Sequence, residues 1–355
     1  MEKILIKRNV FTFILIGTIG LLISCTTTLY LPERFFLDTN VLIYDRYNEI
    51  GYIGSYPLTI LFYNITGLKY IHFSIIGFMQ YSIVLYILFK IGISKNFHKV
   101  SLKNALIYLL FIITAIYLSM PAKDFLNFVY VSLIIFVFKE YGTDVKKALA
   151  IGFTLLLIFA VFYRIYYLFI IVLSIGMFAL SKLNLRNKRL TTIFISLMGM
   201  VFISLSYGVV KGKYISEETR YRINISRLGE DNANSMILSP MAPDTWYGEL
   251  VSIFHGFFSV NLPVNGLKHL LSPHIVAFVI WQLLFFVVLF IRFGHCFKKG
   301  RKNNPELWLF LMLFSFFVVQ GVFEPDLGSA IRHKAGIFPL IYYLFYYEDL
   351  RKKLR

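Results

Sequence analysis

The sequence predicts an all-α polytopic membrane protein with about ten transmembrane helices, and three observations carry this prediction. The first is composition, because 58% of the 355 residues are hydrophobic and only 15% are charged, against about 25% charged residues in a soluble domain. The second is that long apolar runs recur along the whole chain. The third is the distribution of charge between the segments that connect these runs. We therefore expect a single integral membrane domain over residues 1–355.

Ten apolar runs approach the length of a bilayer-crossing helix, about 20 residues with an allowance for tilt. They cover residues 10–30, 71–92, 105–119, 124–139, 147–163, 166–181, 190–210, 274–293, 306–323 and 335–347. A polar turn separates the third and fourth runs, and the fifth and sixth meet at Arg164. The tenth run is short and rich in tyrosine. Two long connections, 31–70 and 211–273, lie on the same side of the predicted membrane.

Alternating crossings place the excess positive charge on one side. With both termini inside, the inner segments hold 23 of the 36 Lys and Arg residues but only six of the 19 acidic residues. The outer segments keep 13 of each, so the net charge of +17 lies on the inner side. This positive-inside asymmetry predicts a multi-pass protein of the bacterial inner (plasma) membrane with cytoplasmic N- and C-termini. It also explains the charge without a nucleic-acid partner.

The two outer loops, 31–70 and 211–273, combine mixed charges with aromatic, Gly and Pro residues, and long loops in compact proteins are usually functional. The first loop is either a vestibule that binds sugar or phosphate or an ordinary solvated loop. In the second, Arg220 and Arg222 either bind a diphosphate or pair with neighbouring acidic residues. Glu249 and His255 follow on a predicted interfacial helix.

Two short outer motifs carry further ionisable groups. Lys123 and Asp124 stand where a helix should begin, so they either cap it and snorkel to the interface or belong to a site. Arg164 stands between two apolar runs with almost no loop. A guanidinium there is costly and indicates a functional site, and its planar fork of donors suits phosphate. Snorkelling among the adjacent tyrosines is the alternative.

The stretch Glu324–His333 packs two carboxylates, a turn, Arg332 and His333 into ten residues between two runs. It is either a site or a tight outer turn with internal ion pairs. We expect His333 to be neutral beside Arg332 and therefore suited to act as a general base. Asp326, Glu249 and His255 are the other candidate bases. The sequence contains no HExxH, CxxC, P-loop or dinucleotide-binding motif, so we expect neither a metal nor a cofactor.

Three stretches carry a resemblance to a known family: Ser-Met-Pro-Ala-Lys-Asp-Phe (119–125), Phe-Tyr-Arg-Ile-Tyr-Tyr (162–167) and Glu-Pro-Asp-Leu-Gly-Ser-Ala-Ile-Arg-His (324–333). With about ten spans and a large late outer loop, the chain resembles the Wzy-type O-antigen or capsular polysaccharide repeat-unit polymerases, including the EpsG-like branch. The resemblance covers most of the chain in layout but is specific only in these stretches.

The resemblance implies metal-independent glycosyl transfer at the periplasmic face. The donor would be a growing glycan on undecaprenyl diphosphate, and the acceptor a single lipid-linked repeat unit. It also implies a chain-length regulator as a partner besides the lipid bilayer. In this interpretation Arg164, Arg332, Arg220, Arg222 and Lys123 bind the diphosphate, because arginines can stabilise its growing charge without a metal.

Two other functions stay open on the sequence alone. A membrane-embedded glycosyltransferase of the C type would use a polyprenyl-phosphate sugar, and it would carry an acidic pair in the first outer loop, which Glu33 and Asp38 match only loosely. A flippase or transporter of lipid-linked oligosaccharide would have more spans and charges along the membrane midplane. Here the ionisable residues gather at the outer edge instead.

Overall fold

The computed structural model describes residues 7–45, 51–183, 187–229, 235–269, 273–298 and 304–351. Over these residues the chain is helical, without a β-strand, and an isolated β-bridge joins Met236 to Asp326. The chain divides into two compact units. Unit 1 contains residues 1–165 and 332–355, and unit 2 contains residues 166–331. Parts of the predicted outer loops, 46–50, 230–234 and 270–272, lie outside the described residues, as do both chain ends.

Unit 1 contains α1 (Arg8–Thr26), α2 (Leu37–Tyr44), α3 (Ser55–Ile65), α4 (Phe73–Ile91), α5 (Leu102–Tyr117), α6 (Lys123–Glu140), α7 (Val145–Phe162), α15 (Phe338–Phe345) and α16 (Tyr347–Leu350). Unit 2 contains α8 (Tyr167–Ser181), α9 (Lys188–Lys211), a π-helical turn (Glu217–Tyr221), α10 (Arg222–Ser226), α11 (Trp246–Asn261), a 3-10 turn (Val264–His269), α12 (Pro273–Lys298) and α13 (Pro305–Phe323). Helix α14 (Leu327–Gly336) begins in unit 2 and ends in unit 1.

The first nine predicted runs each coincide with one helix to within a few residues. Among the described residues, six helices are long and apolar enough to cross a membrane: α1 with the turn that follows it, α4, α7, α9, α12 and α13. Helices α5 and α8 are apolar but shorter. The chain is therefore a helical protein with several apolar helices suited to a membrane, whereas the number ten stays a prediction.

The tenth run does not form one continuous helix. The chain is helical as α14 to Gly336 and again as α15 from Phe338, with Pro339 near the start of the second helix. Eight residues of α15 are about 12 Å long, too short for a hydrocarbon core of about 30 Å. Tyrosines of the tenth run make polar contacts inside unit 1, where the Tyr342 hydroxyl donates to the Gly92 carbonyl at 2.8 Å and the Tyr346 hydroxyl donates to Asn104 at 2.7 Å.

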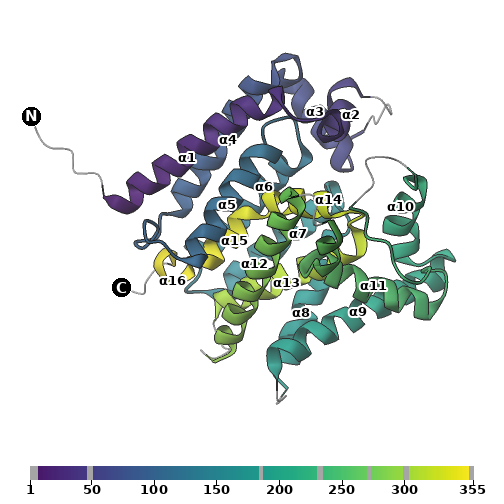
Figure 1. Cartoon of the computed structure of the whole chain (residues 1–355). Helices are drawn as coiled ribbons and strands as arrows, with labels where there is room; N and C mark the ends of the chain where they lie inside the picture. Colours follow the sequence, from purple (N-terminus) through teal and green to yellow (C-terminus); the bar gives the residue numbers. More distant parts are fainter. Residues whose placement is uncertain are drawn as a thin grey trace, which may run out of the picture. The chain divides into compact units, whose positions relative to one another are not determined.

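Unit 1 is built on close contact of α1 with α4, which run side by side (Figure 1). A Cβ at Gly77 of α4 would stand 2.3 Å from the Ser24 carbonyl oxygen and 2.8 Å from that of Ser119. Only glycine fits there, because the helix backbone approaches two neighbouring backbones. Phe111 of α5 and Phe338 of α15 pack edge to face at 5.2 Å and extend this core to the C-terminal segment.

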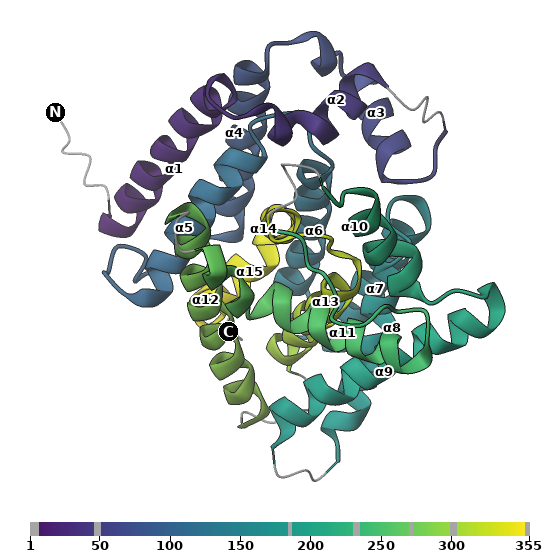
Figure 2. The same ribbon diagram turned by 45° about the vertical axis from the view of Figure 1, so that its right-hand side comes forward.

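Unit 2 is organised around α13, which packs on α8 and α11 (Figure 2). Helix α11 crosses it at two glycines. A Cβ at Gly321 would lie 2.6 Å from the Phe257 Cα, and one at Gly256 would lie 2.0 Å from the Gly321 carbonyl oxygen. Small residues at a helix crossing let the backbones approach. Because α11 packs against α13, the second half of the 211–273 segment is part of the packed core of this unit rather than a solvated loop.

Candidate functional site

The start of α6 is held in place by two buried tyrosines of unit 1. The backbone N–H of Ala122, which precedes the helix, donates to the Tyr63 hydroxyl at 3.0 Å. The Tyr163 hydroxyl donates to the carbonyl of Lys123 at 2.9 Å and lies 2.8 Å from the hydroxyl of Thr59. These contacts join α3, the start of α6 and the end of α7, so the first turn of α6 has a fixed position.

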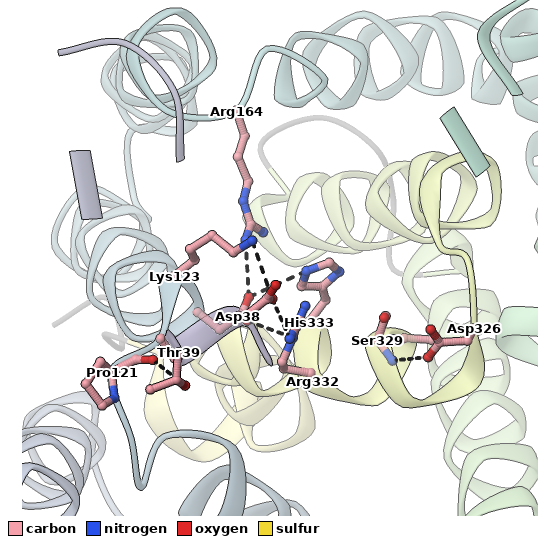
Figure 3. Close-up of polar contacts among 12 residues, drawn as sticks. Asp38, Thr39, Pro121, Lys123, Arg164, Asp326, Ser329, Arg332 and His333 are labelled. Atoms are coloured by element: carbon pink, nitrogen blue, oxygen red, sulfur yellow. Dashed lines mark hydrogen bonds and ion pairs between the residues drawn. The ribbon is translucent and has the colours of Figure 1, made fainter. Parts of the chain in front are cut away.

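Asp124, in this first turn, is the centre of a charged cluster. Figure 3 shows Asp38, Lys123, Arg164, Arg332 and His333 gathered in one place. The Asp124 side chain is almost completely buried, at 1% exposure. Its Oδ1 is 3.4 Å from Arg164 Nη2 and 3.8 Å from His333 Nε2, and its Oδ2 is 3.3 Å from Arg332 Nε. A carboxylate in the first turn also interacts favourably with the helix dipole. The buried Asp124 carboxylate therefore lies next to three basic side chains, Arg164, Arg332 and His333, from two distant parts of the sequence.

Asp38 of α2 adds a second carboxylate. Its Oδ2 is 2.6 Å from Arg332 Nη1 and 3.4 Å from Lys123 Nζ. Burial favours the neutral acid, but the Arg332 and Lys123 charges outweigh it, so the pKa of Asp38 lies well below its usual value. The Tyr56 hydroxyl donates to Asp38 at 2.7 Å, and Lys123 Nζ lies 3.4 Å from the centre of the Tyr56 ring. The segment 31–70, predicted as the first outer loop, thus contributes directly to the cluster.

We call this group the Asp124 cluster: Asp38, Lys123, Asp124, Arg164, Arg332 and His333. It holds three basic side chains, Lys123, Arg164 and Arg332, and two carboxylates. Burial lowers the pKa of Lys123 to about 8, so at neutral pH the cluster carries one net positive charge when His333 is neutral. The side chains of Arg332 and His333 are 25% and 17% exposed, whereas Lys123 and Arg164 are buried. Such a site can bind an anionic group from its exposed side and present an imidazole next to it.

The structure brings together four of the predicted site residues, Lys123, Arg164, Arg332 and His333, within unit 1. The other five, Arg220, Arg222, Glu249, His255 and Asp326, belong to unit 2. Asp38 is predicted from the sequence only as an acid of the first loop and, with Glu33, as a loose match to an acidic pair, and no role is predicted for Tyr56, Tyr63 or Tyr163. The signal for Asp38 was an isolated acid in the apolar stretch Phe35–Tyr44, which is typical of a paired carboxylate.

Arg220 and Glu249 are packed inside unit 2 with partners of their own. The Arg220 guanidinium is 1% exposed and donates to the Gly321 carbonyl at 2.5 Å and to the Ser252 carbonyl at 2.6 Å. Burial lowers the pKa of Arg220 to about 10, against the opposing effect of Glu249, so it stays charged at neutral pH. Glu249, fully buried, accepts hydrogen bonds from the Ser204 and Ser216 hydroxyls. Neither group has a surface left for a diphosphate.

Asp326 and Arg222 also have identifiable positions. Asp326 accepts from the Ser329 N–H at 2.8 Å, which caps the start of α14, and pairs with Arg227 at 2.9 Å. The predicted turn after Glu324 therefore leads at once into a helix. Arg222 is exposed on α10. His255 is half-buried on α11, and its Nε2 lies 3.4 Å from the Ser259 hydroxyl.

Over the described residues, no group of three or more His, Cys, Asp or Glu side chains is arranged to hold a metal ion. In the Asp124 cluster the basic side chains surround the carboxylates, and this donor set suits an anion better than a cation. Comparison with known proteins adds no homologue: neither a protein-family model, nor a curated protein, nor a solved structure matches this chain.

Proposed function

We propose that this chain is a glycosyltransferase that polymerises undecaprenyl-diphosphate-linked repeat units at the outer face of the bacterial inner membrane. The observation that carries the proposal is the Asp124 cluster, in which Lys123, Arg164 and Arg332 outnumber two carboxylates and His333 lies beside them. The composition and the apolar helices support the membrane-embedded part of this proposal.

The reaction requires stabilisation of a diphosphate leaving group. The acceptor hydroxyl forms a bond to the anomeric carbon of the donor glycan, while the bond from that carbon to the diphosphate oxygen breaks. The electron pair of this bond goes to the diphosphate, whose charge grows in the transition state. Fixed guanidinium and ammonium groups stabilise such charge without reorganisation. Arg332 is the most exposed of the three cations, and we assign it the direct contact, with Arg164 and Lys123 supporting the field.

The acceptor hydroxyl must lose its proton, and His333 is the candidate base. Its Nε2 faces Asp124 Oδ1 at 3.8 Å. The tautomer that carries its proton on Nε2 interacts favourably with this carboxylate and leaves Nδ1 as the proton acceptor. Once Nδ1 has taken the proton, the imidazolium is stabilised by Asp124, as in hydrolases that orient a histidine with an aspartate. Asp124 is thus a positioning residue, and Asp38 holds Arg332 and Lys123.

The proposal can be tested with purified full-length protein in nanodiscs and a lipid-linked repeat unit. We expect products that increase by whole repeat units and release of undecaprenyl diphosphate. Deletion of the gene should leave the surface glycan with one repeat unit attached. A glycan that lacks even one repeat unit would indicate a flippase or an earlier transferase, and activity with a polyprenyl-monophosphate sugar alone would indicate a C-type enzyme. Either result overturns the proposal.

A further inference from the structure

Unit 2 contains a pocket of about 470 Å³ that the proposed chemistry does not use. This volume is within the range of about 300–1,000 Å³ for small-molecule sites. The pocket lies between α11, the segment 235–238, the 3-10 turn that begins at Val264, and the start of α14. All of its lining residues lie in unit 2.

The polar part of the lining is uncharged. It consists of the side chains of Ser235, His255, Ser259 and Asn265, and the described lining contains no Lys, Arg, Asp or Glu. Burial, followed by the positive charge of Arg220, lowers the pKa of His255, so the imidazole is neutral at physiological pH. A phosphate would find no charged side chain among the described lining residues. The pocket therefore favours an uncharged ligand.

The apolar part of the lining is supplied by Met236, Leu238, Val264 and Leu327, among others. A purely apolar occupant, such as an isoprenoid chain, would leave the Ser259 hydroxyl and His255 Nε2 only their mutual contact at 3.4 Å, and any hydrogen bonds that they make to water would be lost. Each such loss costs about 1–3 kcal/mol. A sugar ring satisfies both parts of the lining, because its hydroxyls can bond Ser259, His255 and Asn265 while its C–H faces pack on aliphatic side chains.

We propose that this pocket binds an uncharged sugar residue, so that unit 2 holds a saccharide site in addition to the Asp124 cluster. The inference rests on the proposed function only in assigning that sugar to a lipid-linked glycan. A site of this kind would select the glycan by its sugars rather than by its diphosphate. His255 would then be a binding residue rather than the base that the sequence suggested.

The test uses full-length protein in nanodiscs and saturation-transfer NMR with D-glucose, D-galactose, N-acetylglucosamine and N-acetylgalactosamine as probes. We expect saturable binding of at least one sugar. Leu238→Trp places an indole in the pocket mouth and should weaken binding more than about tenfold, whereas Ser259→Ala should weaken it by about three- to tenfold through one lost hydrogen bond. Leu228→Trp is the matched control, because Leu228 and Leu238 are similarly exposed, at 54% and 48%, and only Leu238 lines the pocket.

Absence of saturable binding for all four sugars, or unchanged binding in Leu238→Trp, overturns the inference. Arg332→Ala separates this site from the proposed activity, since it should abolish chain extension and leave sugar binding within about twofold of wild type. Sugar binding by a protein that never extends a glycan would refute the proposed function and keep the site. Chain extension by a protein that binds none of the sugars would refute the saccharide site and keep the proposed function.

Discussion

Both units of the molecule bury charged side chains, but they do so in different ways. In unit 2, Arg220 and Glu249 are 1% and 0% exposed, and serine hydroxyls and backbone carbonyls satisfy them. In unit 1, Asp124 is equally buried, yet it is surrounded by side chains of which Arg332 and His333 are partly exposed. The same residue types therefore form a closed structural network in one unit and an open cluster with excess positive charge in the other.

This difference shows how ionisable residues with a structural role can be distinguished from those that bind a ligand in a helical protein with apolar helices. A buried charge whose hydrogen-bond partners are all buried backbone groups or serine hydroxyls is part of the packing, and its removal should act on stability. A charge with an exposed edge and a surplus of one sign can act on a ligand, so its removal should act on activity. The predictions below test this distinction, from the largest expected effect to the smallest.

The largest effect is expected on the stability of unit 2. Arg220→Met removes the donors of the Gly321 carbonyl, the Ser252 carbonyl and the Ser252 hydroxyl, which should cost about 3–5 kcal/mol, since each buried polar group left unsatisfied costs about 1–3 kcal/mol. The thermal midpoint and the yield of folded protein in detergent measure this loss. Arg222→Met is the matched control, because Arg222 is exposed two residues away and should change stability by less than about 0.5 kcal/mol. Equal behaviour of the two variants would refute the structural role of Arg220.

The next effect is expected on activity. Arg332→Ala removes the exposed cation of the Asp124 cluster and should lower the rate of chain extension by about 100- to 1,000-fold, the usual effect of losing one transition-state donor. Arg227→Ala is a close control, since the two arginine side chains are 25% and 27% exposed and each pairs with an aspartate. We expect Arg227→Ala to keep activity within about threefold. Long glycans made by Arg332→Ala at normal protein levels would contradict the site.

Sequence reasoning located the helices well because apolar runs of this length have few other uses. Lys123, Arg164, Arg332 and His333 were predicted as site residues, and the structure places all four together. The sequence could not distinguish the roles of these residues from that of Arg220, because a buried structural arginine and a ligand-binding arginine have the same local sequence context in a polar loop. That distinction depends on Gly256 and Gly321, whose close helix crossing places carbonyl acceptors around the guanidinium. This difference in role depends on tertiary packing, and no local sequence pattern reports it.

A smaller effect is expected from the tyrosine that joins the first outer loop to the Asp124 cluster. Tyr56→Phe removes the hydrogen bond to Asp38 but keeps the ring near Lys123. Loss of one such bond is worth about 0.5–1.5 kcal/mol, so chain extension should slow by about two- to tenfold. Tyr56→Leu should slow it further, because it also removes the cation–π contact. Tyr52→Phe, at an exposed position of the same loop, should have no effect on the rate measured with lipid-linked repeat units.

The smallest effect is a pH dependence of stability that originates at Asp38. The pKa of Asp38 is lowered on folding, and its value in the unfolded chain is about 3.9. A carboxyl group with a lowered pKa contributes stability above the unfolded pKa, and this contribution is lost as the pH falls toward the folded pKa. Since Asp38 is partly exposed, we expect this contribution to the free energy of unfolding to be only about 1 kcal/mol.

Wild-type protein should therefore have a higher thermal midpoint than Asp38→Asn at pH 6–7, and the difference should shrink below about pH 4. Asp244→Asn is the control for the loss of one carboxylate, since Asp244 is exposed and belongs to unit 2. If the difference between wild type and Asp38→Asn is constant from pH 7 to pH 3, the Arg332 and Lys123 charges do not stabilise the Asp38 carboxylate, and the open cluster lacks the electrostatic coupling that distinguishes it from the buried network of unit 2.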